Sequence, residues 1–152
     1  MQKETFDKLL DSVRKHEGYR NKVYLDTLKK RTVGVGHLCV EDFWEDNKEY
    51  EEKFLMDILQ KDLQGAIEGA EDLINNCPSG GKANISDEAK IIIIELVFQL
   101  GKTGVSKFRN MWKALQQNPP QYSVAASEML DSRWAKQTPN RAKEMSNHMA
   151  HA

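Results

Sequence analysis

Two acidic residues and one threonine in the first third of the chain have the types and spacing that acid–base chemistry needs. Glu17 lies eleven positions after Phe6 and four after Val13, so it continues the apolar face of a helix instead of its solvated face. A carboxyl group in a half-buried position must be paired or have a raised pKa, and a raised pKa suits a general acid at neutral pH. The alternative is an ordinary glutamate that reaches water from a helix end.

Asp26 and Thr32 stand on either side of a short polar loop. Residues 22–26 and 32–38 alternate in polarity like two strands, which predicts a β-hairpin with a five-residue connection. Because side chains directly opposite each other on paired strands are about 5 Å apart, and the chain doubles back after Glu17, we expect the three residues to face one cleft. Two carboxyl groups in unlike environments, with a hydroxyl to hold a water, suit glycoside hydrolysis. The alternative is an aspartate that only flanks a turn.

The rest of the chain indicates helices. Residues 5–17 form one that Gly18 ends, and residues 49–75 carry a long apolar stripe. Ser86 is a good N-cap for a further helix that extends to residue 100. Its run of isoleucines also suits a strand, but the length and the cap favour a helix.

Two more helices are expected over residues 106–117 and 121–135, and Thr138 is expected as the N-cap of a last helix with Pro139 at its first position. The methionines at positions 111, 129, 145 and 149 are expected to fill the core or flank these helices. The predicted fold class is α+β, mostly α, with one small antiparallel sheet.

The composition is that of one soluble globular domain. The chain has 152 residues, of which 39% are hydrophobic and 30% charged. The longest apolar run, residues 91–100, is far shorter than the roughly 18–20 residues of a membrane helix, and the first ten residues lack the apolar region of a secretory signal. We expect neither stable membrane insertion nor a signal peptide.

The formal net charge of −1 hides an uneven distribution. Lys and Arg outnumber Asp and Glu by nine to five in residues 1–40 and by ten to six in residues 76–152, whereas residues 41–75 carry three against twelve. A nucleic-acid-binding protein usually has a basic surplus, so we expect no nucleic-acid partner.

Cofactor and metal motifs are incomplete. Gly101-Lys102-Thr103 lacks the first glycine of a phosphate-binding loop, and the four histidines share no metal-ligand spacing. Cys39 and Cys77 are interpreted as reduced thiols. We expect neither a metal nor a cofactor.

Residues 16–38, HEGYRNKVYLDTLKKRTVGVGHL, resemble the active-site segment of the T-even phage lysozyme family, muramidase endolysins of the glycoside hydrolase class. The signature of that family runs E-G, a short gap, Y-x-D-T, a turn, and then T-x-G-x-G-H-L. Two further stretches agree in order and spacing, VFQLGKTGVSKF at 97–108 and SRWAKQTPNRAK at 132–143. On these three segments the chain is identified as a member of the family.

The resemblance implies a two-lobed phage-type lysozyme fold within a single domain of residues 1–152. Residues 18–60 would form the small lobe with the hairpin, and residues 49–75 the linking helix. Residues 1–17 would join residues 76–152 in the helical lobe.

The resemblance also implies roles for individual residues. Glu17 matches the general acid of the family, Asp26 the carboxylate that positions or activates a water, and Thr32 the threonine that helps to hold this water. His37 matches a histidine that pairs with an aspartate of the long helix, here Asp62. Arg141 matches an arginine that pairs with the catalytic glutamate. The positions that line the sugar-binding cleft correspond to Leu38, Phe98 and Gln99.

The chain departs from the family pattern at several positions. The turn after Asp26 usually contains glycine, whereas here it reads Leu28-Lys29-Lys30-Arg31. Two cleft positions that are serine and asparagine in the best-known member are Met111 and Glu128 here. These departures affect the contacts with substrate more than the chemistry.

The implied function is hydrolysis of the β-1,4 bond between N-acetylmuramic acid and N-acetylglucosamine in peptidoglycan. We expect a monomer that accumulates in the host cytoplasm and depends on a separate holin-type membrane protein to reach the wall. The alternatives are a lytic transglycosylase, which cuts the same bond without water, and a non-catalytic glycan-binding module with the lysozyme fold. The presence of both Asp26 and Thr32 favours hydrolysis.

Overall fold

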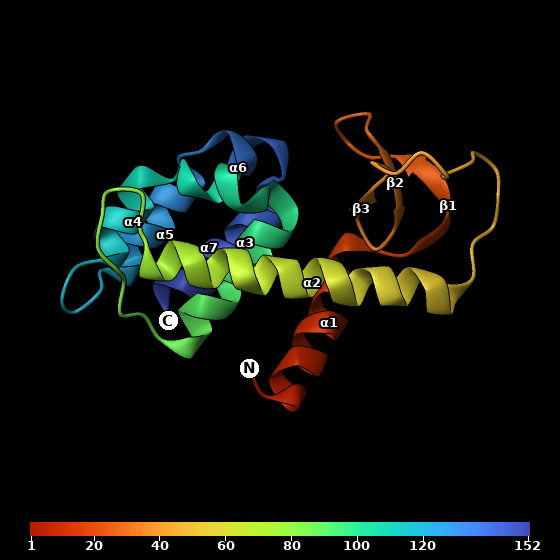
Figure 1. Cartoon of the computed structure of the whole chain (residues 1–152). Coiled ribbons are helices and arrows are strands. Elements are labelled where there is room, and N and C mark those ends of the chain that lie inside the picture. The colour runs from red at the N-terminus through yellow and green to blue at the C-terminus, as the bar shows by residue number, and fades with distance from the viewer. The chain divides into compact units, whose positions relative to one another are not determined.

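The computed structural model describes all 152 residues and contains seven helices and three strands (Figure 1). In chain order these are α1 (Lys3–Glu17), β1 (Arg20–Leu25), β2 (Arg31–Gly34), β3 (His37–Leu38), α2 (Glu52–Asn75), α3 (Asp87–Ser106), α4 (Arg109–Leu115), α5 (Tyr122–Leu130), α6 (Arg133–Gln137) and α7 (Pro139–Ala150). The predicted fold class, mostly α with one small antiparallel sheet, is confirmed. None of the helices combines the length and the apolar character that spanning a membrane would require.

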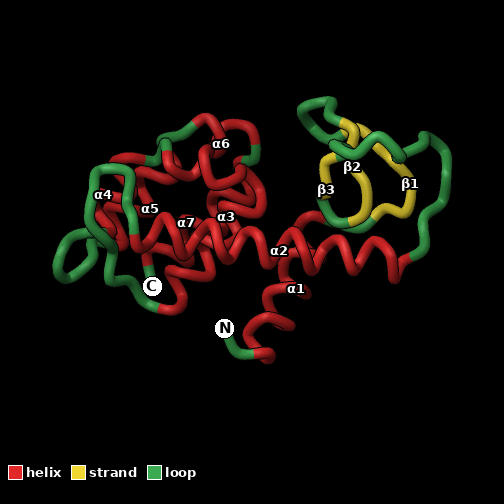
Figure 2. The backbone as a smooth tube through the Cα atoms, in the orientation of Figure 1, coloured by secondary structure: helices red, strands yellow, loops and turns green.

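The chain divides into two compact units, Met1–Gly65 and Ala66–Ala152, with the boundary inside α2. The first unit contains α1, all three strands, which Figure 2 draws in yellow, and the N-terminal part of α2. The second unit contains only helices. The expected division into lobes, with residues 1–17 in the helical one, stays a prediction.

Helix α1 presents Glu17 at its C-terminal end. Leu9 and Val13 are buried on the apolar face, and Glu17 is half-buried one turn further on. Gly18 then adopts a φ of 75°, a left-handed conformation that glycine reaches at little cost, and its N–H donates to the carbonyl of Arg14 at 2.9 Å. The helix therefore ends directly after the candidate acid, as predicted.

Strands β1 and β2 form the predicted hairpin. They are antiparallel, with Tyr24 opposite Thr32, and the connection closes where the N–H of Asp26 donates to the carbonyl of Lys30 at 3.0 Å. The prediction of one continuous strand over residues 32–38 is wrong. Gly34 and Gly36 have φ values of 63° and 67°, so the chain reverses there and β3 folds back antiparallel onto β2.

An aromatic cluster forms the hydrophobic core of the first unit. Val33, Trp44 and Leu55 form its buried centre, and Tyr50 packs edge-on against Trp44 with ring centroids 4.8 Å apart. Rings in this arrangement bring favourable edge-to-face contact in addition to burial. The cluster joins β2, the segment after β3 and the first turns of α2.

Helix α3 confirms the helical prediction for residues 86–100. The hydroxyl of Ser86 accepts the N–H of Ala89 at 3.2 Å, which is an N-cap, and residues 92–97 are buried. Gly101 has a φ of 76° and interrupts the helix before it continues to Ser106.

Two predictions about the C-terminal helices need correction. The single helix expected over residues 121–135 is divided into α5 and α6, because Asp131 leaves helical geometry and Ser132 caps a new helix by accepting the N–H of Ala135 at 3.1 Å. Thr138 precedes α7, but its hydroxyl donates to the carbonyl of Trp134 at 3.0 Å and does not cap the helix.

The core of the second unit is built from large side chains of α3, α4, α5 and α7. The indole N–H of Trp112 donates to the carbonyl of Val105 at 3.0 Å, which satisfies the one polar atom of a fully buried ring. The four methionines expected in the core or beside the helices are all fully buried, at positions 111, 129, 145 and 149.

Candidate active site

Most of the predicted site residues belong to the first unit. These are Glu17, Asp26, Thr32, His37, Leu38 and Asp62. The remaining three, Phe98, Gln99 and Arg141, belong to the second unit.

The side chain of Glu17 lies against the β2–β3 turn. A Cβ placed on Gly36 would stand 3.3 Å from Oε2 of Glu17 and 3.6 Å from its Cβ and Cγ. The positive φ of Gly36 favours glycine, and a side chain there would also push the Glu17 carboxyl group away by a few tenths of an ångström. The second glycine of the G-x-G stretch thus brings the sheet up to the candidate acid.

The carboxylate of Asp26 is held by the hairpin turn itself. Its Oδ1 accepts the backbone N–H groups of Leu28 and Lys30, each at 2.8 Å. This is the arrangement by which aspartate commonly closes a turn. The two bonds orient the carboxylate and engage one of its oxygens, so Oδ2 remains the oxygen that can accept a proton from a bound water.

The hydroxyl of Thr32 is oriented by the same turn. It donates to the carbonyl of Lys30 at 2.9 Å, and the residue is only 3% exposed. Because its single proton is already donated, the hydroxyl can take part in a further hydrogen bond only as an acceptor. Leu38, the expected sugar contact, is the β3 partner of Thr32 and is 42% exposed.

Tyr24 is a residue that the sequence analysis did not single out. It faces Thr32 across the hairpin, and the guanidinium of Arg20 lies 4.8 Å above its ring. Burial raises the pKa of the Tyr24 phenol, and the negative charges of Glu17 and Asp26 raise it further, against the opposing effect of Arg20. The phenol therefore lies within the electrostatic reach of both candidate carboxylates. Its position two residues before Asp26 on one strand face was the available sequence signal.

His37 is bound on both ring nitrogens. Nδ1 lies 2.7 Å from Oδ2 of Asp62, the pairing that the resemblance implies, and Nε2 lies 2.9 Å from Oε1 of Glu41. The hydrogen bond to Asp62 is the main cause that raises the pKa of His37 to about 9, and Glu41 adds to it against the cost of burial. Glu41 was not predicted from the sequence, because an acid four residues after the histidine in an irregular segment belongs to no recognisable pattern.

Arg31, the first residue of β2, is exposed like the neighbouring lysines, but its charge is paired. Its guanidinium makes a salt bridge with Asp46 at 3.0 Å and donates to the carbonyl of Trp44 at 3.2 Å. Lys29 and Lys30 are exposed at the hairpin turn. The free positive charge next to Asp26 therefore comes from the two lysines.

In the second unit Gln99 is held by two neighbours. Its Oε1 accepts the indole N–H of Trp134 at 2.9 Å, and its Nε2 lies 3.7 Å from Sδ of Met145. Phe98 precedes it on α3 and is half-buried. The amide of Gln99 is thus fixed from the α6 and α7 side.

Arg141 is largely buried on α7. Its guanidinium lies 3.3 Å from Oε2 of Glu95, which is itself buried on α3, and 3.9 Å from Oε1 of Glu144. The sequence analysis did not anticipate Glu95, whose position inside an isoleucine-rich helix was the signal. The pairing of Arg141 with Glu17 stays a prediction.

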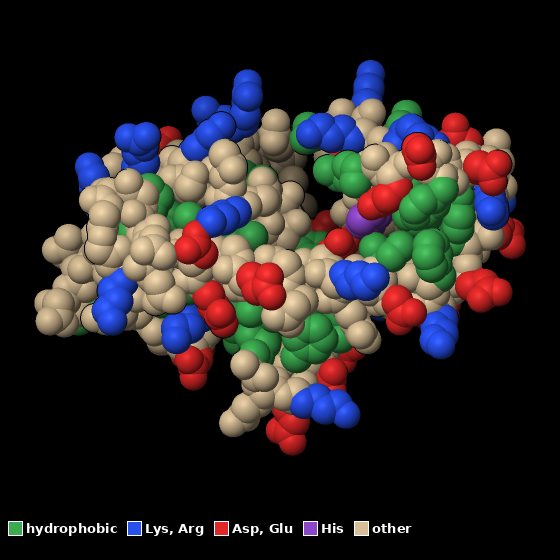
Figure 3. Space-filling view, viewed as in Figure 1, with side chains coloured by type: hydrophobic (Ala, Val, Ile, Leu, Met, Phe, Trp, Pro, Cys, Tyr) green, Lys and Arg blue, Asp and Glu red, His purple; other side chains and the backbone are tan.

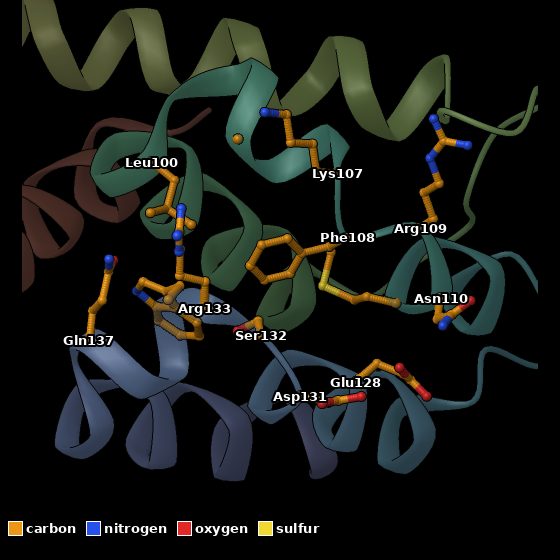
Figure 4. A pocket seen from close by; sticks show the side chains of 13 residues that line it. Leu100, Lys107, Phe108, Arg109, Asn110, Glu128, Asp131, Ser132, Arg133 and Gln137 are labelled. Carbon is orange, nitrogen blue, oxygen red and sulfur yellow. The ribbon is translucent and has the colours of Figure 1, made fainter.

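An open pocket of about 440 Å³ lies in the second unit beside this group (Figure 4). The ring of Trp134 lines it, together with Met111 and Glu128, the two cleft positions where the sequence departs from the family pattern. Figure 4 shows its charged residues, which are of both signs: Lys107, Arg109, Glu128, Asp131 and Arg133. Both of these cleft positions therefore lie in the lining of an accessible pocket.

Comparison with known proteins shows which family the chain belongs to. The sequence profile of the family described as phage lysozyme matches residues 14–150. The chain belongs to the phage lysozyme family, which makes it a lysozyme-type glycoside hydrolase by class.

Three relatives are similar over most of the chain. A probable T4-type lysozyme 1 of Dictyostelium discoideum is 29% identical over 89% of both chains, and a probable T4-type lysozyme 2 of the same organism is 25% identical over 90% of both. The pre-baseplate central spike protein Gp5 of Enterobacteria phage T4 is 27% identical over 90% of this chain but only 26% of its own length. The same domain thus occurs alone and as part of a longer protein.

Proposed function

We propose that the protein hydrolyses the β-1,4 bond between N-acetylmuramic acid and N-acetylglucosamine in peptidoglycan, with inversion at the anomeric carbon. The observation that carries this proposal is that one small sheet holds two carboxyl groups in unlike surroundings. The β1–β2 turn binds Asp26 through backbone amides, while the β2–β3 turn packs Gly36 against Glu17. Unlike surroundings are what separate the acid from the base in such a pair.

Glu17 acts as the general acid in this proposal. It gives its proton to the glycosidic oxygen as the bond from that oxygen to the anomeric carbon breaks. The end of α1 and the Gly36 backbone limit the space around its carboxyl group, which supports a fixed direction for the proton.

Asp26 and Thr32 hold the attacking water. The water donates one hydrogen bond to the Thr32 hydroxyl, whose own proton is engaged by the Lys30 carbonyl. Oδ2 of Asp26 then accepts the second proton as the water oxygen bonds to the anomeric carbon. An inverting mechanism needs the two carboxyl groups about 6.5–9.5 Å apart, to admit this water. Leu38, Phe98 and Gln99 would contact the sugar rings.

Mass spectrometry of digested peptidoglycan tests this reaction against its alternatives. Hydrolysis yields reducing ends, whereas a lytic transglycosylase would yield 1,6-anhydro ends, and a non-catalytic binding module would yield no fragments. Reaction in H₂¹⁸O adds a second check, because only hydrolysis incorporates the label. Anhydro products, or none, would refute the proposal.

Substitution of Glu17 tests the assignment of the acid. We expect Glu17→Gln to lose about a hundredfold or more of the rate, because general acid catalysis commonly contributes that much. The variant should remain at least as stable, since the substitution removes a half-buried charge. Asp11→Asn, which removes an exposed carboxylate from the same helix, is the matched control. A Glu17→Gln variant that cleared cell walls at a substantial rate would exclude Glu17 as the acid.

We further propose that the enzyme serves host cell lysis as a monomer. It would accumulate in the host cytoplasm and act on the wall after a separate holin-type membrane protein opens the membrane. Expression in a host with and without a membrane-permeabilising protein tests this dependence. Lysis by the enzyme alone would contradict it.

A further inference from the structure

A segment after β3 ties this short strand to the rest of the first unit through Glu41. One oxygen of this carboxylate, Oε1, receives two N–H groups, from Nε2 of His37 at 2.9 Å and from Nε1 of Trp44 at 2.7 Å. Hydrogen bonds to an ionised group are shorter and stronger than those between neutral groups. Both donors also lower the pKa of Glu41, so the carboxylate is charged at neutral pH. Glu41 therefore links His37 of β3 to the buried indole of Trp44.

Trp44 in turn contacts β2. The carbonyl of Trp44 accepts from the guanidinium of Arg31, the first residue of β2, and the indole ring is 5% exposed in the aromatic cluster. The N–H of Cys39 donates to the carbonyl of Arg31 at 3.0 Å. Residues 37–44 thus form a closed loop over β2, and Glu41 is the side chain that bridges its two ends.

The sheet holds Thr32 and Leu38 with unequal strength. Thr32 lies on the central strand, paired with Tyr24 on one side and Leu38 on the other, and its hydroxyl is bound to Lys30. Leu38 lies on a two-residue edge strand whose position depends on β2 and on the loop that follows. Loosening this loop would displace Leu38 while Thr32 stays in place.

In Figure 3 acidic and hydrophobic side chains adjoin each other on the side where Figure 1 draws the sheet. Glu41 differs from the adjacent Asp42 because its carboxylate accepts hydrogen bonds from His37 and Trp44. Asp42, the next residue, is exposed and makes no hydrogen bond or ion pair.

We propose that Glu41 is a positioning residue that holds β3, and with it the substrate contact of Leu38, by clamping His37 to Trp44. This role rests on the proposed function for its catalytic meaning. Glu41 itself touches neither of the candidate carboxyl groups in this scheme. Its effect should therefore fall on KM for the glycan, with kcat spared.

Steady-state kinetics on soluble glycan chains of alternating N-acetylglucosamine and N-acetylmuramic acid test the proposal. We expect Glu41→Ala to raise KM three- to tenfold while kcat stays within twofold of wild type. Glu41→Gln should restore part of the loss, because its amide oxygen can still accept an N–H group. Asp42→Ala, which removes the same charge one residue away, should match wild type in both constants. Circular dichroism would verify that each variant is folded at the assay temperature.

Amide hydrogen exchange gives a readout that does not depend on activity. In Glu41→Ala the N–H of Cys39 should exchange at least ten times faster than in wild type. In Glu41→Gln it should exchange a few times faster than in wild type. The N–H of Asp26, bonded to Lys30 in the other turn, should keep its rate. An unchanged rate at Cys39 overturns the proposal, as does an unchanged KM in a variant whose only defect is a lower Tm.

The two proposals can fail separately. Wild-type protein that binds the glycan but releases no fragments would refute the hydrolytic function. Faster exchange at Cys39, together with weaker binding of the glycan by Glu41→Ala, would still support the positioning role.

Discussion

The backbone of Gly36 lies directly against the carboxyl end of Glu17, so that a Cβ at position 36 would come within 3.3 Å of Oε2. The two residues belong to different elements, a turn between strands and the last position of a helix. Because an added Cβ would push Oε2 away by a few tenths of an ångström, the glycine helps to set the position of the candidate acid.

We expect Gly36→Ala to lower the rate of wall hydrolysis at least tenfold, because the new methyl group must displace the carboxyl group of Glu17. The substitution also strains a backbone with a φ of 67°, at a cost of about 1 kcal/mol. Gly80→Ala is the matched control, because its φ is 89° and nothing lies within 4 Å of the added Cβ. Thermal unfolding and initial rates of both variants check the prediction. Equal rates at equal loss of stability would show that the contact with Glu17 is unimportant.

Asp26→Asn should reduce the rate about a hundredfold while the hairpin stays intact. Asparagine keeps an Oδ1 that can accept the N–H groups of Leu28 and Lys30, so the substitution removes the charge and leaves the turn bonds. Clearing of cell walls measures the rate, and the spectrum of backbone amides reports the hairpin. A rate near that of wild type would exclude Asp26 from the reaction.

Thr32 should tolerate serine but not valine. Serine retains a hydroxyl that can donate to Lys30 and accept from water, so we expect a rate within about threefold of wild type. Valine has nearly the same shape but no hydroxyl, and we expect at least a tenfold loss. If Thr32→Val and wild type had the same rate, the hydroxyl would have no role in holding water.

The stability of the protein should fall as the pH rises from neutrality through about 9. The pKa of His37 rises from 6.5 to about 9 on folding, so the folded state binds this proton more tightly, and the stabilisation is complete below pH 6.5 and lost above 9. The rise corresponds to at most ~3.4 kcal/mol. Because the partner carboxylates are about one-third exposed, we expect about 2 kcal/mol.

Denaturant unfolding between pH 6 and 10 measures this effect. The His37→Asn variant should lose the alkaline slope, whereas His148→Asn, which changes an exposed histidine of α7, should keep it. If the unfolding free energy of His37→Asn fell with rising pH as steeply as that of wild type, other groups would be the cause of the effect.

Activity on cell walls should depend on salt through Lys29 and Lys30. The wall is polyanionic and the net charge of the enzyme is −1, so attraction must come from charges close to the bound glycan. At 0.15 M salt the screening length is about 8 Å. We expect the double variant Lys29→Gln/Lys30→Gln to lose a few-fold in rate at 20 mM salt and little at 300 mM. Arg31 is left intact because it is bound to Asp46 and Trp44.

Lys3→Gln/Lys8→Gln is the control for this measurement, because it removes the same charge from the exposed face of α1. Its rate should follow that of wild type at every salt concentration. A loss of equal size in both double variants would indicate long-range attraction, and no loss in either would make the loop irrelevant to binding.

Local sequence patterns predicted the elements that depend on nearby residues. The apolar spacing of α1, the stop at Gly18 and the cap at Ser86 are all decided within about one helical turn, and the structure confirms them. The sequence pattern did not predict the chain reversal that two glycines produce together. Gly34 and Gly36 turn the chain within an alternating stretch, which periodicity alone describes as one strand.

The candidate site shows the same division. The sequence by itself singled out Glu17 and Asp26 as candidates for the chemistry, because Glu17 falls on an apolar helix face and Asp26 flanks a predicted turn. Only the tertiary structure decided that Gly36 contacts Glu17 and that Glu41 bridges His37 and Trp44. These contacts form only when loops close and the aromatic cluster packs. Residues that meet in this way share no period or motif along the chain, so their contact cannot be predicted from local sequence patterns.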